Sequence, residues 1–127
     1  MTTVEDIQGI SITLTRLLEL LEVEEDEDDY VIRKSTGYAF KKTMSMVLEA
    51  HSVMGNSFPR ASASTDYEGG VRLTWKKVDS ERTVRLFCPA NSEQAMDVYY
   101  CTDTDYGIED VFSVLTLVHR LEWFNEE

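Results

Sequence analysis

Residues 61–89, ASASTDYEGGVRLTWKKVDSERTVRLFCP, decide the fold of this chain. Val71, Leu73 and Trp75 alternate with charged or polar residues, and residues 84–88 repeat the pattern. A period of two is typical of half-buried antiparallel strands that turn one side toward a core. The stretch therefore predicts a β-meander joined by short turns. Its predicted strands span residues 61–65, 71–77, 83–88 and 96–101.

Helices are expected before and after this meander in the sequence, and they should cover one of its faces. Ser35 or Thr36 can cap a helix that runs to Met54, where Gly55 and the following Pro59 stop it. A polar turn at residues 102–107 should then lead into a last helix at 109–124. We therefore expect an α+β domain in which a three- to four-stranded antiparallel meander packs against two or three helices.

The N-terminal segment has an amphipathic pattern. Residues 2–5, TTVE, have the spacing of a capping box, and apolar residues from Ile7 to Leu21 follow at alternating steps of three and four. Such a seam packs on its own domain or pairs with a second copy as a homodimer. About two heptads are short for an independent coiled coil, which favours packing within the domain.

Length and charge limit the class of protein. The 127 residues, 43% hydrophobic and 28% charged, fit one domain made of residues 1–29 (helix and acidic linker) and 30–127. Seven of the eight residues at 22–29 are acidic, and without them the net charge of −12 falls to −5. The start MTTVEDIQ lacks a basic signal region, and no apolar run could span a bilayer, so we expect a cytoplasmic protein that binds neither membrane nor nucleic acid.

The cysteines and the acids after the fourth predicted strand suggest no cofactor and no metal. Cys88 and Cys101 should lie on neighbouring strands, where a disulfide is conceivable but two buried thiols are favoured. Four acids surround Gly107, but their spacing fails the calcium-loop pattern, and a turn followed by a helix N-terminus explains them. These acids are Asp103, Asp105, Glu109 and Asp110.

No catalytic motif appears in the sequence. The two histidines, His51 and His119, lie in predicted helices without a second ligand at metal spacing. An enzyme or small-ligand binder would have to bring one of them to Asp103–Asp110 in space. We expect no enzyme and keep this arrangement as the alternative.

The outward side of the predicted strands is the candidate site. If the apolar residues face the core, Arg72, Lys76, Arg85 and Phe87 share the other side, with Tyr99 beside them. A solvated face, a contact for a protein partner, and a platform for single-stranded nucleic acid all fit this composition. The negative net charge disfavours the nucleic-acid interpretation.

Three short motifs carry a resemblance to a known group of proteins. They are Phe58-Pro59-Arg60, Glu68-Gly69-Gly70-Val71-Arg72 with Trp75, and Tyr106-Gly107-Ile108-Glu109-Asp110. On these motifs the C-terminal two thirds of the chain resembles small uncharacterised bacterial proteins of the cyanobacterial type. The resemblance implies an α+β fold in a bacterial cytoplasm and no particular activity.

The sequence therefore predicts a non-enzymatic module that binds a protein partner, as an adaptor, an antitoxin-like neutraliser or an inhibitor, or as an acidic mimic of nucleic acid. Its contacts would be the outward strand residues or the acidic run. The expected partner-binding residues are Arg72, Lys76, Arg85, Phe87, Glu24, Glu25, Asp26, Glu27, Asp28 and Asp29.

Overall fold

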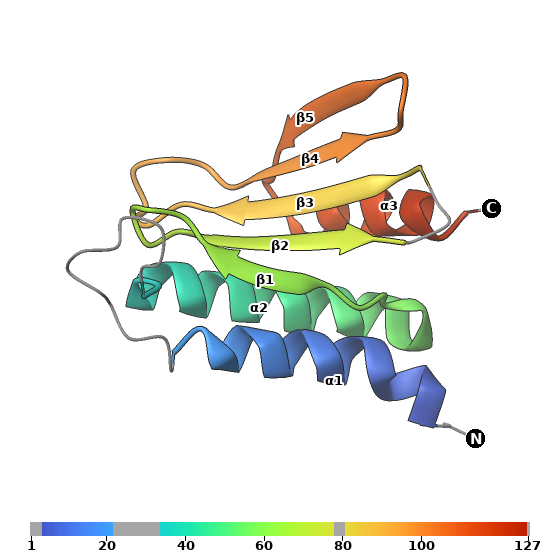
Figure 1. Ribbon diagram of the computed structural model, residues 1–127, viewed down its shortest axis with the longest axis horizontal. Coiled ribbons are helices and arrows are strands. Elements are labelled where there is room, and N and C mark those ends of the chain that lie inside the picture. Colours follow the sequence, from blue (N-terminus) through green and yellow to red (C-terminus); the bar gives the residue numbers. More distant parts are fainter. Residues whose placement is uncertain (1–3, 22–33, 78–80, 127) are drawn as a thin grey trace.

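The structure is an antiparallel sheet with helices on one side. The computed structural model describes residues 4–21, 34–77 and 81–126, with the backbone alone at 4–8. In chain order the elements are α1 (Val4–Glu19), α2 (Gly37–Met54), the short 3-10 helix η1 (Gly55–Ser57), β1 (Ser62–Thr65), β2 (Val71–Lys76), β3 (Thr83–Cys88), β4 (Asp97–Cys101), β5 (Tyr106–Asp110) and α3 (Val114–Asn125). Neighbouring strands pair in chain order from β1 to β5, while α1 lies beside β1 and α2 (Figure 1). The predicted α+β class is confirmed.

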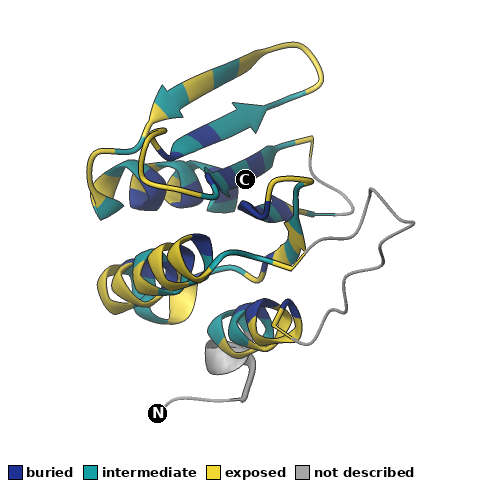
Figure 2. Cartoon of the chain, turned by 90° about the vertical axis from the view of Figure 1, so that its left-hand side faces the viewer, coloured by how far each residue is buried: buried dark blue, intermediate teal, exposed yellow. Residues whose placement is uncertain are grey.

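The core lies between the sheet and the helices. Val71, Leu73 and Trp75 on β2 are fully buried, as are Val84 and Leu86 on β3. Buried residues gather between the layers, shown in dark blue in Figure 2. The alternation in the sequence thus predicted correctly which side of β2 and β3 is apolar, because period-two side chains point to opposite faces. The helices contribute Leu17, Ala39, Val47, Ala50, Leu117, Val118, Leu121 and Phe124 to this core.

The start of α2 is tied to two loops through one residue. The Thr36 hydroxyl accepts a hydrogen bond from the Ala39 amide (3.1 Å) and donates one to the Ala90 carbonyl (2.6 Å). The Thr36 amide donates to the Gly69 carbonyl (3.0 Å). Gly69 has φ of 93°, a conformation that favours glycine. Thr36, one of the two predicted caps, is therefore the N-cap and also anchors the β1–β2 turn.

Helix α1 is held against the segment that leads into β1. The Thr13 hydroxyl is buried; it accepts from the Ala61 amide (3.0 Å) and donates to the Gly9 carbonyl (2.8 Å). A Cβ at Gly9 would overlap the Phe58 carbonyl oxygen, so only glycine lets the helix approach this closely. The helix thus docks through one hydrogen bond and one close backbone contact.

The described part of the N-terminal seam packs within the chain. Leu17 is fully buried, and Ile10 and Leu14 pack against the core. The helix ends at Glu19, so Leu21, which closes the predicted seam, lies beyond it and is exposed.

The sheet has five strands, so the predicted number of three or four was wrong. We expected a polar turn at 102–107 and a helix from Glu109, but Tyr106–Asp110 forms β5. Helix α3 begins later, at Val114, and its N-cap is Ser113, whose side chain accepts from the Leu115 amide. The interpretation of Glu109 and Asp110 as caps of the last helix was therefore wrong as well.

Long-range contacts explain why β5 was not predicted from the sequence. Its inward-facing residues are Gly107 and Glu109, neither of which is apolar. A Cβ at Gly107 would overlap the Tyr100 hydroxyl, and Glu109 forms an ion pair with Arg120 of α3. The strand is thus specified by partners on β4 and α3 rather than by its own hydrophobic pattern.

Replacing Thr13 by Val should destabilise the protein by about 2 kcal/mol, because the buried Ala61 amide would lose its acceptor. Thr15→Val is the matched control, since the Thr15 hydroxyl makes the same bond to the carbonyl four residues back but is exposed. We expect the control to change the free energy of unfolding by less than about 0.5 kcal/mol in urea titrations. Equal losses in the two variants would contradict the docking role of Thr13.

Candidate functional site

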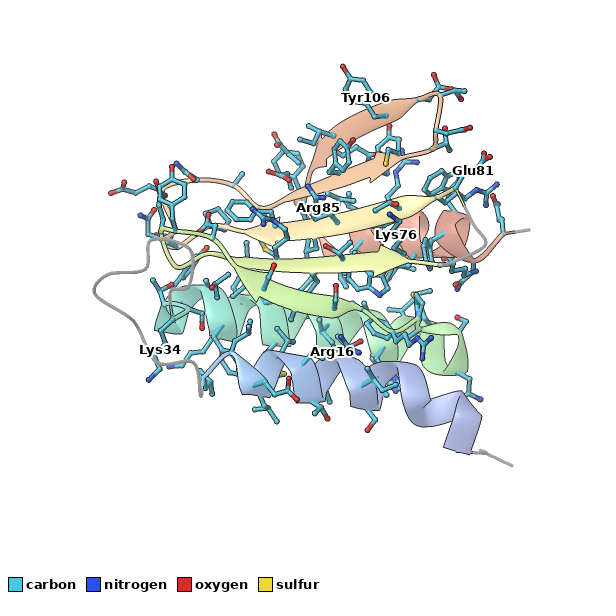
Figure 3. All side chains as sticks on the ribbon, in the orientation of Figure 1. Arg16, Lys34, Lys76, Glu81, Arg85 and Tyr106 are labelled. Atoms are coloured by element: carbon cyan, nitrogen blue, oxygen red, sulfur yellow. The ribbon has the colours of Figure 1, made fainter. Side chains whose placement is uncertain are left out.

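The candidate site is the side of the sheet turned away from α2 and α3, here called the outer face. Strand pairing arranges its side chains from β2 to β5 in three rows. The rows are Arg72, Phe87, Asp97 and Asp110; Thr74, Arg85, Tyr99 and Ile108; and Lys76, Thr83, Cys101 and Tyr106. All these residues are exposed or half-buried, and within the described ranges no helix lies against them (Figure 3). The outer face is thus an open surface with a defined register.

The β2–β3 half of the outer face is cationic. Arg72, Lys76 and Arg85 form no ion pair with any residue that the structure describes. The Arg85 guanidinium carbon lies 5.4 Å from the centre of the Tyr99 ring, and its Nε is buried without a hydrogen-bond partner. Stacking on the ring holds this guanidinium in place, which leaves its hydrogen-bonding capacity to an added acceptor.

The β4–β5 half of the outer face is apolar and aromatic. Tyr106 is 80% exposed and Ile108 is 64% exposed. The Tyr106 and Tyr99 ring centres lie 6.4 Å apart, so the aromatic surface continues to the stacked Arg85. Large apolar side chains exposed along an edge strand are a feature that many interaction surfaces have.

Two carboxylates meet on the first row. Asp97 on β4 is opposite Asp110 on β5 in the register. Burial, and then the charge of Asp110, raise the pKa of the Asp97 carboxyl above its ordinary value. This corner of the outer face therefore favours a cation or a proton, in contrast to the cationic half.

Other basic residues are already used to attach α3 to the sheet. The Arg120 guanidinium lies 3.5 Å from the centre of the Tyr100 ring and binds Glu109. Arg82 lies 5.0 Å from the Trp123 ring centre and pairs with a C-terminal glutamate. Lys77 lies 4.9 Å from the ring centre of a core phenylalanine. These three cations connect α3 to the sheet, whereas Arg72 and Lys76 of the outer face have no such contact with the residues that the structure describes.

The structure gathers the sequence-predicted strand residues on one surface. Arg72, Lys76, Arg85 and Phe87 all belong to the outer face. The six predicted acidic contacts at 24–29 lie outside the described residues. Sequence reasoning missed Tyr106 and Ile108, since their segment was expected to be a turn and a helix start. The alternation of YGIED, with Tyr and Ile at every second position, was the available signal.

The alternative histidine site is not assembled around His51. His51 packs edge-on against Phe58 with ring centres 6.1 Å apart, next to β1. Asp103–Asp110 lies along the turn and strand at the opposite edge of the sheet (Figure 1). His119 is exposed on α3, and its neighbour Arg120 is the residue that binds Glu109. Among the described residues, no three His, Cys, Asp or Glu side chains form a group that could hold a metal ion.

The two cysteines lie on neighbouring strands but at opposite ends of the ladder. Cys101 is opposite Thr83, the first residue of β3, whereas Cys88 is its last. Cys88 is fully buried on the core side and Cys101 belongs to the outer face, so the conceivable cross-strand disulfide was wrong. Burial raises the pKa of the Cys88 thiol, which keeps it protonated and unreactive at neutral pH.

Comparison with protein-family models, with curated proteins and with solved structures found no match to this chain. In the described parts of the chain, no helix combines the length and the hydropathy that crossing a membrane requires. The argument for function therefore rests on the outer face itself.

Replacing Asp97 by Asn should stabilise the protein at pH 7 by about 0.5 kcal/mol, since it removes one of two facing carboxylates that water partly screens. Folding raises the pKa of Asp97, so its charged carboxylate destabilises the folded state. This destabilisation is absent below the unfolded pKa of about 3.9, grows as the pH rises from there to the folded pKa, and stays constant above it. Urea titrations at several pH values measure this dependence.

Asp105→Asn is the control for Asp97→Asn, because Asp105 is exposed in the β4–β5 turn and its replacement removes the same charge. An equal gain in both variants would show that net charge alone, rather than the Asp97–Asp110 pair, sets the effect.

Proposed function

We propose that this chain is a non-enzymatic interaction module that binds a protein partner through the outer face. The observation that carries the proposal is the coexistence, on one open sheet surface, of unpaired Arg72, Lys76 and Arg85 with exposed Tyr106 and Ile108. Such a module would act as an adaptor, an antitoxin-like neutraliser or an inhibitor. The partner that fits is a protein surface with carboxylates beside an apolar side chain.

The cationic half supports carboxylate recognition. Arginine is enriched in protein interfaces because its planar guanidinium presents several donors to a carboxylate. Arg85 is preorganised by its stacking on Tyr99, so less side-chain entropy is lost when a carboxylate binds. Charges are screened beyond about 8 Å at physiological ionic strength, so these local cations govern contact even though the whole chain carries −12.

The apolar half supports an anchor for the partner. Tyr106 and Ile108 lie one row apart on β5, and Tyr99 extends their surface toward the centre of the sheet. Interfaces draw most of their binding energy from a few such aromatic and arginine residues surrounded by weaker contacts. A partner that places an apolar side chain between Tyr106 and Ile108 can set its carboxylates over Arg85.

The acidic run at 22–29 is a second proposed contact, carried by the sequence alone. It would engage basic residues of the same partner or of another one. If instead it covers the cations of the outer face within the chain, neutralising its acids should strengthen partner binding rather than weaken it.

Reversing two charges of the outer face, Arg72→Glu with Arg85→Glu, should weaken partner binding by about tenfold or more, because both carboxylate contacts become repulsive. The tagged protein would capture the partner from nuclease-treated lysate of its native host, and the purified pair would then be titrated. The matched control is Lys41→Glu with Lys42→Glu, the same charge change on exposed residues of α2.

Tyr106→Ala tests the apolar half without changing the charge. It replaces the double variant in the binding experiment if Arg85→Glu impairs folding. Circular dichroism establishes that each variant is folded. Unchanged binding in the folded Arg72/Arg85 variant and in Tyr106→Ala would contradict the proposal. A partner that is captured from untreated lysate but not from the nuclease-treated lysate would instead point to nucleic acid and would also contradict the proposal.

A further inference from the structure

A pocket that the sequence did not suggest opens beside the β1 edge of the sheet. Its volume is about 290 Å³, near the lower limit for small-molecule sites. Figure 3 shows Arg16 between α1 and β1, with Lys76 above it on β2. The lining residues are Arg16, Arg60, Ala61, Ser62, Thr74 and Lys76.

The pocket is positively charged, although the chain as a whole is acidic. Its lining holds three of the 12 basic residues and, among the residues that the structure describes, no acidic one. Arg16, Arg60 and Lys76 have no ion pair or hydrogen-bonded side chain with any residue that the structure describes. An acid, Glu19, lies with Arg16 on the adjoining surface of α1 but does not line the pocket. Three converging and uncompensated cations are a site for an anion.

The backbone around the pocket is held in place by the contacts that dock α1. Arg60 lies between Pro59, whose carbonyl accepts from the Trp75 indole N–H (2.9 Å), and Ala61, whose amide donates to Thr13. Arg16 follows Thr13 by one helical turn. The two arginines therefore start from fixed positions, which lowers the entropy cost of closing them on a ligand.

Two hydroxyls complete the donor set. Ser62 and Thr74 are opposite each other in the β1–β2 register, and both line the pocket. The Ser62 hydroxyl donates to the Thr74 carbonyl at 3.4 Å, a long bond that it can exchange for a better acceptor. Three cations and two hydroxyls exceed what one carboxylate with two oxygens can use, and they match the three terminal oxygens of a phosphate monoester dianion.

We propose that this pocket binds the phosphate group of a small phosphate monoester. The organic part would lie along the adjoining surface of α1, formed by Ser11, Ile12, Thr15, Arg16 and Glu19. Arg16 belongs to both this surface and the pocket, so it would contact the ligand next to its phosphate group. The pocket and the outer face share Thr74 and Lys76, whereas Arg16, Arg60, Ala61 and Ser62 line the pocket alone.

The test is a titration of the ¹⁵N-labelled full chain, followed by amide shifts, with inorganic phosphate, glycerol 3-phosphate and acetate at constant ionic strength. Both phosphates should shift the amides of residues 60–62 and 74–76 with saturation, whereas acetate should not. Arg16→Gln with Arg60→Gln should weaken phosphate binding by about tenfold or more. Lys41→Gln with Lys42→Gln, which lowers the charge equally on α2, should change it less than about twofold.

The outcomes separate the sources of the phosphate and the two proposals. Tighter binding of glycerol 3-phosphate than of inorganic phosphate supports an ester ligand, and equal binding supports the phosphate group alone. Arg72→Gln should leave phosphate binding intact, while Arg16→Gln/Arg60→Gln should leave partner capture intact, so each proposal can fail alone. Non-saturating shifts, or equal weakening in the Lys41/Lys42 variant, would overturn the phosphate site.

Discussion

The hydrogen bond from the Trp75 indole to the Pro59 carbonyl holds together the parts on which the rest of the structure depends. Trp75 is fully buried on the core side of β2 near the end of the strand, and Phe58 packs edge-on against it with ring centres 6.2 Å apart. The loop fixed in this way presents the Ala61 amide to Thr13 of α1. One tryptophan thus determines where the chain enters β1 and where α1 docks.

This junction places all three helices on the core side or at the β1 edge, and it has two consequences for the surface. Within the described residues, the outer face stays uncovered, so its cations and aromatics are available to a partner. Arg60, located between the two anchored residues, is directed to the same pocket as Arg16. The proposed interface and the proposed phosphate site therefore follow from the same packing arrangement, and they adjoin each other at Thr74 and Lys76.

The distribution of the basic residues strengthens the argument for function. Lys77, Arg82 and Arg120 lie over aromatic rings and attach the sheet to α3. Their replacement would lower the free energy of unfolding. Within the described fold Arg72 and the pocket arginines have no such contact, and Arg85 stacks on Tyr99 of the outer face itself rather than on α3. In a chain with twice as many acids as bases, these cations, which have no acidic partner among the described residues, are the basis of both proposals.

Sequence patterns predicted those features that depend on local periodicity. Strands β2 and β3 were recognised because their apolar residues alternate, and α2 because Thr36 and Gly55 mark its ends. Strand β5 was missed because a glycine that fits under Tyr100 and a glutamate that binds Arg120 replace its apolar side.

The cationic half of the outer face could be predicted from the same alternation, whereas no local sequence pattern indicated the pocket. Its three cations come from a helix, a loop and a strand that only the tertiary fold brings together.

The most direct test of the central claim, that the open outer face is the binding surface, is tyrosine iodination of the free protein and of its complex with the captured partner, quantified by mass spectrometry. Tyr106 is 80% exposed on the outer face, and Tyr38 is 36% exposed on α2 behind the sheet. The account predicts that complex formation protects Tyr106 and leaves the reactivity of Tyr38 unchanged. Protection of Tyr38 with full reactivity of Tyr106 would place the partner on the helices and contradict the account.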